Sequence, residues 1–405
     1  MKKRVPVFVL VSAIVFTAVT TIFLTVFSLS AYGIFDKSDF HAADYNSADK
    51  AAEIQSLLEN YYVGELDDTY MGDVLADSMI YATEDRWAYY VPASDAEQYY
   101  NTSANSYCGV GITIEQESSE YGFVVISVME DSPAYDAGIR AGDILQGVEK
   151  QDVLELGLEE TQNLVRGKEG TSVSLSLLRD GSTYCVDVTR KMVRLRVVTS
   201  RMMGDNIAYI KINNFEEDSA RQTVNAVSQA LADGAEGIVF DLRFNPGGHK
   251  NELISVLDYL LPEGPIFKEK LYNGQETTTQ SDDSCVDVPM AVLVNAESFS
   301  ASEFMAAALQ EYNWAVVVGE KTVGKGHYQY PFELKDGSVV SFSVGQYYTP
   351  TEKSLDGIGI VPNMTVDLTE EQLLQLYSGS LEDSEDLQLQ AALEQVGNLL
   401  KAERS

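Results

Sequence analysis

The sequence contains few cysteines and few histidines, which limits the chemistry available to it. There are three of each among 405 residues. No C-x-x-C and no H-E-x-x-H occurs, and an odd, sparse set of cysteines argues against a disulfide framework and a zinc site. The cysteines are widely spaced: Cys108, Cys185 and Cys285. We therefore expect no metal and no cofactor, and a nucleophile would need a base other than a histidine cluster.

Positive charge is also scarce. The chain has 28 Lys and Arg against 62 Asp and Glu, which gives a formal net charge of −34. A polyanion would be repelled at long range, so we expect no nucleic-acid partner. The ordinary explanation for the excess is a solvated acidic surface that keeps the protein soluble.

The amino-terminal segment is the one long run without charge. Lys2, Lys3 and Arg4 precede an uncharged stretch over residues 5–35, and Asp36 is the first acidic residue. About twenty apolar residues span a bilayer as a helix, and basic residues hold their end in the cytoplasm. The pattern predicts a single-pass cell-membrane anchor with the body outside the cytoplasm. A cleaved signal peptide is the alternative, and it too exports the body.

Length and texture predict a multidomain protein of mixed α/β class. The anchor and linker occupy residues 1–42, a helical, Tyr-rich region covers 43–105, and short β-branched runs separated by Gly, Asp and Pro cover 106–192. Strands interleaved with helices fill 193–368, which predicts a buried sheet covered by helices. Acidic, helical sequence covers the last part, 369–405.

The α/β region has a regular order of elements. Apolar patterning predicts helices over 220–232, 251–261 and 300–310 and strands over 207–212, 237–242, 291–294, 315–318 and 339–344, all in one sheet. In the tail, Leu389, Leu393, Val396 and Leu400 form one apolar stripe on a helix. This stripe covers either the body of the protein or a second subunit, which leaves a homodimer open.

A glycine-flanked loop opens the β-rich region. Gly109, Val110, Gly111 and Ile112 lead into a strand, and the glycines let backbone N–H groups converge into a nest for a carboxylate. The strand that follows can accept an added peptide strand. A tight turn without a ligand is the simpler interpretation. With S-P-A at 132–134 and G-D-I-L at 142–145, the region resembles the PDZ domain of bacterial proteases, which implies binding of protein C-termini.

Two residues carry the catalytic hypothesis. Ser300 follows a predicted strand and opens a helix, where the dipole favours negative charge, although with Glu303 it also reads as a plain capping box. Lys325 lies between two glycines after an apolar run. A buried lysine loses its charge and can act as a base, whereas a lysine on a solvated loop would stay protonated.

Three segments resemble the C-terminal processing peptidases, also called tail-specific proteases. They are D-L-R-F-N-P-G-G at 241–248, V-N-A-E-S-F-S-A-S-E at 294–303 and V-G-E-K-T-V-G-K-G-H-Y-Q at 318–329. The resemblance implies a PDZ-containing serine peptidase with a crotonase-like core and a dyad of Ser300 and Lys325. It also implies that Gln329 orients the lysine amine.

An acyl-transfer mechanism also needs backbone donors for the oxyanion. The N–H of Ala301 is one candidate, and Gly248, or failing it Gly247, supplies the other. Arg166, in the V-R-G before the last PDZ strands, is a candidate switch between the PDZ domain and the core. His249 could be mistaken for a triad histidine, but the base role is already filled.

The predicted activity is endopeptidase cleavage of proteins or peptides with free C-termini. One rival is a non-catalytic, membrane-anchored PDZ scaffold that binds protein tails, which would need neither Ser300 nor Lys325. A second is an enoyl-thioester enzyme on a related core, which would use acidic catalysts instead of a Ser–Lys pair.

Overall fold

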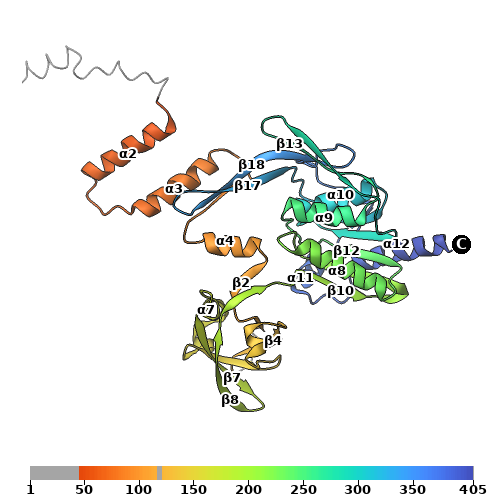
Figure 1. Cartoon of the computed structure of the whole chain (residues 1–405), viewed down its shortest axis with the longest axis horizontal. Coiled ribbons are helices and arrows are strands. Elements are labelled where there is room, and N and C mark those ends of the chain that lie inside the picture. Colours follow the sequence, from red (N-terminus) through yellow and green to blue (C-terminus); the bar gives the residue numbers. More distant parts are fainter. Residues whose placement is uncertain (1–44, 116–120, 405) are drawn as a thin grey trace, which may run out of the picture. The chain divides into compact units, whose positions relative to one another are not determined.

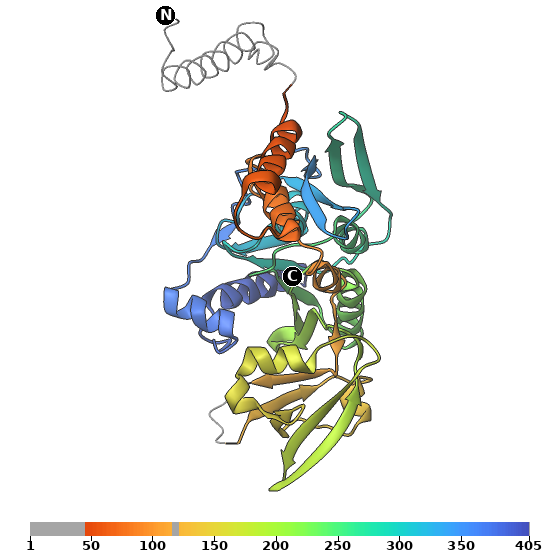
Figure 2. The same cartoon turned by 90° about the vertical axis from the view of Figure 1, so that its left-hand side faces the viewer.

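The computed structural model describes residues 45–115 and 121–404 (Figures 1 and 2). The chain divides into two units, one ending at Val74 and the other beginning at Leu75. The predicted anchor lies outside the described residues. Within the described ranges, no helix is both long enough and apolar enough to cross a bilayer.

Helices α2 (Ser47–Tyr61) and α3 (Asp68–Tyr81) confirm the two helical runs expected before the β-rich region. The side chain of Asn46 accepts hydrogen bonds from the first turn of α2, and Asp49 bonds back to the Asn46 N–H. This reciprocal cap fixes where α2 begins. The second unit then adds strand β1 (Tyr89–Val91), which the sequence did not predict, and helix α4 (Ala96–Ser103).

The predicted PDZ elements are present in the second unit. The β-branched runs predict strands over 111–114, 123–128, 173–178 and 183–188 and a helix over 158–165; the strand over 123–128 and the helix have these bounds as β4 and α7, and the other strands differ by one residue at either end. The sheet order is β3-β4-β5-β7-β8, so β3 is an edge strand; β6 pairs with β5, and β2 pairs separately with β9. The bounds are β2 (Ser106–Gly109), β3 (Ile112–Glu115), β4 (Phe123–Val128), α5 (Pro133–Asp136), β5 (Ile144–Val148), β6 (Gln151–Asp152), α6 (Val153–Leu156), α7 (Leu158–Val165), β7 (Ser172–Arg179), β8 (Ser182–Thr189) and β9 (Lys191–Arg194).

The α/β region contains a sheet of order β10-β11-β12-β15-β16-β19, parallel except for β10 (Figure 1). Its predicted helices are confirmed within one residue at each end. The elements are β10 (Val198–Met202), β11 (Ile207–Ile212), α8 (Ser219–Ala232), β12 (Gly237–Asp241), α9 (Lys250–Leu260), β15 (Met290–Val294), α10 (Ala301–Glu311), β16 (Ala315–Gly319) and β19 (Met364–Thr365).

Side chains alternate between the two faces of this sheet, as the strand pleat requires. Ile210, Phe240 and Val292 belong to the hydrophobic core shared with α8, α9 and α10. Val239 and Leu293 belong to a second core on the other face. Both faces are therefore covered, which explains why the parallel strands are continuously apolar.

One prediction about the sheet is wrong. The strand expected over 339–344 is longer, β18 (Val339–Tyr348), and it belongs to a separate antiparallel sheet of order β1-β18-β13-β14, with β17 also paired to β18. The reason is local, because β17 and β18 are joined by a short turn and pair as a hairpin. The other strands are β13 (Gly264–Leu271), β14 (Glu276–Ser281) and β17 (His327–Glu333).

The C-terminal stripe packs on the body of the protein. Helices α11 (Glu370–Ser378) and α12 (Leu387–Glu403) close the chain, and α12 contacts β12, β15 and β16 (Figure 1). Leu389, Val396 and Leu400 are buried against Val239 and Leu293. Of the two alternatives for this stripe, packing on its own body is confirmed.

This packing predicts a large stability difference between two leucines of α12. Leu389→Ala should lower the free energy of unfolding by about 3 kcal/mol, because it leaves a cavity in a closed core. Leu399→Ala should change it by less than about 0.5 kcal/mol, since Leu399 is 41% exposed. Urea denaturation of the two variants measures the difference. Equal effects would show that α12 does not cover the sheet in solution.

Candidate active site

Ser300 lies at the turn between β15 and α10. Its backbone has φ 60° and ψ −122°, a left-handed conformation that is unusual for a residue with a side chain. A strained strand-to-helix turn of this kind presents a hydroxyl at the start of a helix, with the next N–H directed the same way. Ala301 is the first residue of α10 and supplies that N–H.

Glu303 ties the two catalytic motifs together. Its side chain is fully buried, and its carboxylate accepts hydrogen bonds from the N–H groups of Ser300 (2.9 Å), Gly324 (2.6 Å) and Lys325 (3.0 Å). The Thr322 hydroxyl donates a fourth bond of 2.5 Å. The sequence predicted Glu303 only as part of a helix cap. In the structure the same carboxylate also holds the loop that carries the lysine.

Lys325 lies in a dry environment. Burial lowers the pKa of its ammonium group to about 8, although the carboxylates of Asp85 and Glu303 act in the opposite direction. The amine lies 4.7 Å from the centre of the Trp87 ring, and Trp87 stacks on Phe299 at 5.7 Å. Among the described residues, no hydrogen bond joins the Lys325 amine to the Ser300 hydroxyl. Trp87 thus contacts both the Lys325 amine and Phe299, the residue before Ser300.

Tyr347 connects Ser300 with the Lys325 loop, and the sequence did not identify it as a site residue. Its hydroxyl donates to the backbone carbonyl of Lys325, and the side chain is buried. Burial raises the pKa of this phenol, while a hydrogen bond with the Ser300 side chain acts in the opposite direction. The phenol therefore stays protonated and serves as a donor. The strand predicted from the sequence ends at residue 344, so the pattern did not include Tyr347.

The turn after β12 packs directly on the Ser300 elbow. A Cβ on Gly247 would lie 2.8 Å from the Ala301 nitrogen, so only glycine fits there. The Gly247 N–H already donates to Asn245 Oδ1 at 2.8 Å, whereas no bond from the Gly248 N–H occurs in the part of the chain that the structure describes. Of the two glycines, Gly248 is thus the one with a free donor.

Asn245 fixes this turn to the elbow, a role the sequence did not reveal. Its carbonyl accepts from the Ser302 hydroxyl (2.7 Å) and from the Phe299 N–H (3.2 Å). Its side-chain amide donates to the Ile212 carbonyl at 2.8 Å. Because Asn245 is completely buried, these bonds are made in a low-dielectric environment and hold the turn rigidly.

The remaining predicted core residues lie nearby in different roles. Gln329, on β17, donates to the Ser343 hydroxyl (3.0 Å) and to the His327 carbonyl (3.3 Å) rather than to the lysine amine. Its predicted role in orienting that amine stays a prediction. His249 Nε2 lies 2.8 Å from the Ser103 hydroxyl and 3.2 Å from Glu216, a carboxylate that also acts on Lys325 through its charge.

The PDZ loop lies in a groove of about 860 Å³. Residues 110–114 of the loop and edge strand line one part of it, and Gln162, Val165 and Arg166, at the end of α7, line another. Gly111 has φ 86°, which a side chain would disfavour. The Arg166 guanidinium lies 5.4 Å from the Tyr107 ring centre, so a cation faces the loop.

Comparison with known proteins agrees with this geometry. Residues 206–366 match Peptidase family S41, and residues 124–179 match a PDZ domain. The chain is 30% identical over 373 residues to the probable CtpA-like serine protease of Staphylococcus aureus (strain COL), covering 91% of this chain and 73% of that protein. It is 30% identical over 371 residues to the carboxy-terminal processing protease CtpA of Bacillus subtilis (strain 168), covering 91% and 78%.

Solved structures show the same fold. A putative S41 protease from Bacteroides fragilis aligns with a TM-score of 0.50 and 16% identity over 83% of this chain and 93% of that one. At that identity the likeness concerns the fold alone, whereas the two bacterial relatives share most of their length with this chain. The chain belongs to the carboxy-terminal processing peptidases of family S41 and is a serine-type peptidase.

Proposed function

We propose that this peptidase cleaves protein substrates with Ser300 as nucleophile and Lys325 as general base. The observation that carries the proposal is the shared carboxylate of Glu303, which bonds the backbone N–H groups of both residues. A base whose pKa lies near the working pH is the most effective one, and burial brings Lys325 to that range.

The reaction is acyl transfer. Lys325 takes the hydroxyl proton as the Ser300 oxygen bonds to the scissile carbonyl carbon, and the C–N bond then breaks as the same proton passes to the leaving amine. A water, deprotonated by Lys325, attacks the acyl-enzyme and releases the acid. The developing oxyanion accepts bonds from the N–H groups of Ala301 and Gly248.

The amine has to leave the Trp87 ring before this step. A cation over an aromatic face is stabilised by roughly 1 to 2 kcal/mol, which favours the charged, inactive form of the lysine. Rotation toward Ser300 exchanges that contact for a hydrogen bond to the nucleophile. In the active arrangement we assign Gln329, two residues into the strand that follows, to orient the neutral amine.

Substrates are recruited by their C-termini. The carboxylate would bind at the loop of Gly109 to Ile112, and the tail would pair with the free edge of β3. Arg166 faces this loop and lies at the end of α7, so tail binding would be reported to the core through it. The uncharged segment 5–35 would anchor the protein, single-pass, in the cell membrane with its body outside the cytoplasm, and a homodimer remains part of the proposal.

Removing either member of the dyad should abolish cleavage without abolishing tail binding. We expect Ser300→Ala and Lys325→Ala each to lower kcat by about 10⁴-fold or more, as in other serine peptidases that act through a coupled pair. The measurement is cleavage of an unfolded protein substrate, with tail-peptide affinity as the control for folding. Wild-type cleavage that persists in Lys325→Ala would refute the dyad and leave only a tail-binding protein.

The rate of acylation should depend on pH through Lys325. Only the neutral amine accepts a proton, so kcat/KM should rise with pH and reach half its maximum near pH 8, where the ammonium group of Lys325 loses its proton. Initial rates from pH 6 to 10 on a short peptide give the profile. A midpoint above pH 10, where an exposed lysine titrates, would contradict a buried base.

Tail recognition should depend on a free carboxylate. On the Ser300→Ala protein, a peptide with a free C-terminus should bind about 10- to 100-fold more tightly than its amide, because hydrogen bonds to a charged group are the stronger ones. Fluorescence anisotropy measures both affinities.

Arg166→Ala in the active enzyme should reduce the stimulation of cleavage by a tail peptide. The matched control is Arg140→Ala, at an exposed arginine of the same domain. Equal stimulation in the two variants would contradict the proposed role of Arg166 as a switch.

A further inference from the structure

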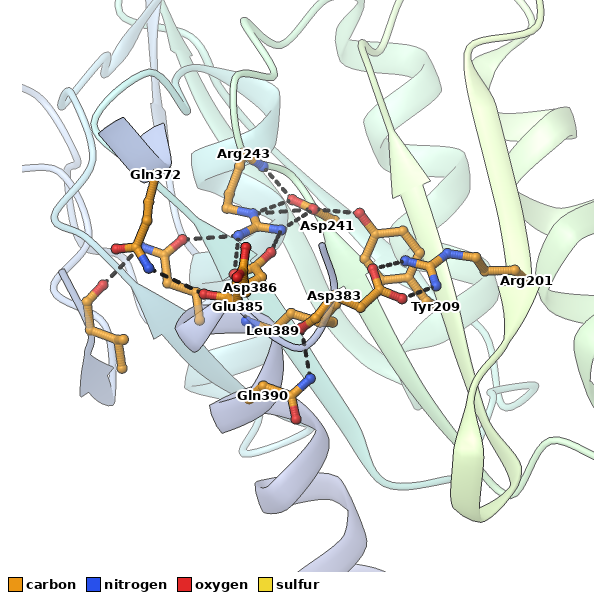
Figure 3. Close-up of polar contacts among 12 residues, drawn as sticks. Arg201, Tyr209, Asp241, Arg243, Gln372, Asp383, Glu385, Asp386, Leu389 and Gln390 are labelled. Carbon is orange, nitrogen blue, oxygen red and sulfur yellow. Dashed lines mark hydrogen bonds and ion pairs between the residues drawn. The ribbon is translucent and has the colours of Figure 1, made fainter. Parts of the chain in front are cut away.

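The C-terminal segment reaches the oxyanion turn through a buried arginine. Arg243 lies two residues after the end of β12 and is 2% exposed. Its Nε bonds both oxygens of Asp241 (3.0 and 3.1 Å), and its Nη2 bonds Asp241 Oδ2 at 2.7 Å. The other side of the guanidinium faces the start of α12, where Nη1 donates to Asp386 Oδ1 at 2.9 Å and to Gln388 Oε1 at 3.1 Å (Figure 3).

Asp386 serves two structures at once. Its Oδ2 lies 2.8 Å from Arg243 Nη2, and its Oδ1 caps α12 by accepting from the Leu389 N–H at 3.0 Å. The carboxylate is 3% exposed, so neither group is screened by solvent. An arginine fork between two carboxylates has a fixed geometry that no apolar contact reproduces. The position of Arg243 is therefore set partly by the start of α12.

A second contact from the same segment holds the next residue. Phe244 has φ 61°, a conformation that costs a non-glycine residue energy and needs restraint. Its N–H donates to Asn295 Oδ1 at 3.0 Å, and its ring meets Tyr377, on α11, edge to face at 5.4 Å. Contacts with residues 377–388 therefore restrain both Arg243 and Phe244. The residues that follow these two form the turn that carries Gly248.

We propose that Tyr377, Asp386 and Gln388 form a C-terminal clamp that positions the oxyanion turn. The clamp lies outside the stretch matched by the peptidase family, which ends at residue 366. It rests on the proposed function, because it acts through the Gly248 N–H on the transition state. Asp386 is a positioning residue in this scheme and does not touch substrate.

The clamp makes a specific kinetic prediction. Asp386→Asn keeps the helix cap, since Asn also caps well, but removes one of the two anionic partners of Arg243 and leaves Asp241. We expect kcat to fall about 10- to 100-fold, because one displaced oxyanion donor costs up to 10² to 10³. KM for a short peptide should change less than about 2-fold, since the ground-state carbonyl depends little on this hole.

A matched control is available three residues earlier. Asp383 lies in the segment before α12 and forms an ion pair with Arg201 of β10 (Figure 3). Its side chain is 44% exposed, and among the described residues it has no hydrogen bond or ion pair with Arg243. Asp383→Asn should therefore leave kcat unchanged. Binding of a peptide aldehyde, whose adduct with Ser300 places an oxyanion in the hole, should weaken in Asp386→Asn in parallel with kcat/KM and stay unchanged in Asp383→Asn.

The outcomes separate the clamp from a structural role and from the proposed function. A merely structural Asp386 would lower the Tm but leave kcat of the folded fraction and aldehyde affinity unaltered, which would overturn the clamp. Tyr377→Ala is a second test of the clamp, at an exposed side chain whose removal the fold should tolerate. A several-fold drop in kcat supports the clamp. A wild-type kcat in this variant, together with a wild-type kcat in folded Asp386→Asn, overturns the clamp. Absence of cleavage by the wild type would instead refute the proposed function.

Discussion

The buried carboxylate of Glu303 is the contact on which the catalytic arrangement depends. A charge in a dry interior needs several donors, and Glu303 finds them on both sides of the site: the Ser300 N–H on its own helix and two N–H groups, with the Thr322 hydroxyl, on the Lys325 loop. Moving the loop would leave the charge unsatisfied. The backbones of Ser300 and Lys325 are therefore held together, and their side chains keep the freedom to rotate.

That remaining freedom belongs to the lysine side chain. Its amine rests on Trp87, while Tyr347 holds the backbone carbonyl of the same residue. Opposing effects act on this amine. Burial is the largest and lowers its pKa, whereas the Trp87 ring and the carboxylate of Asp85 favour the charged form. In the proposed mechanism, the amine acts as a base only after it leaves the Trp87 ring.

The sequence predicted the local elements well and the long-range contacts poorly. Period and turn chemistry located α7, α8 and β11 because each signal lies within a dozen residues. The same signals assigned β18 to the wrong sheet, because apolar alternation predicts a strand but does not say which strand it pairs with. Likewise Ser300 and Lys325 were visible as motifs, whereas Trp87 was not, because its contact with the lysine joins residues far apart in the chain. Asn245 stood inside a quoted motif, yet its role appears only from bonds to the neighbouring elbow.

The two buried charge clusters divide the work of holding the site. Glu303 holds the Lys325 loop to Ser300, and Arg243 lies between Asp241 and Asp386 just before the turn that carries Gly248. Burial opposes ionisation of Asp241, but the guanidinium holds the pKa of that carboxyl below its ordinary value, so the cluster stays charged. A packed apolar contact could stabilise the fold equally well. It would not specify the position of a backbone N–H to a few tenths of an ångström, and an oxyanion donor is useful only within such limits. Buried charged groups therefore hold the backbone at Ser300, Lys325 and Arg243, where a precise position is needed. Apolar packing under α12 serves only to bury one face of the sheet.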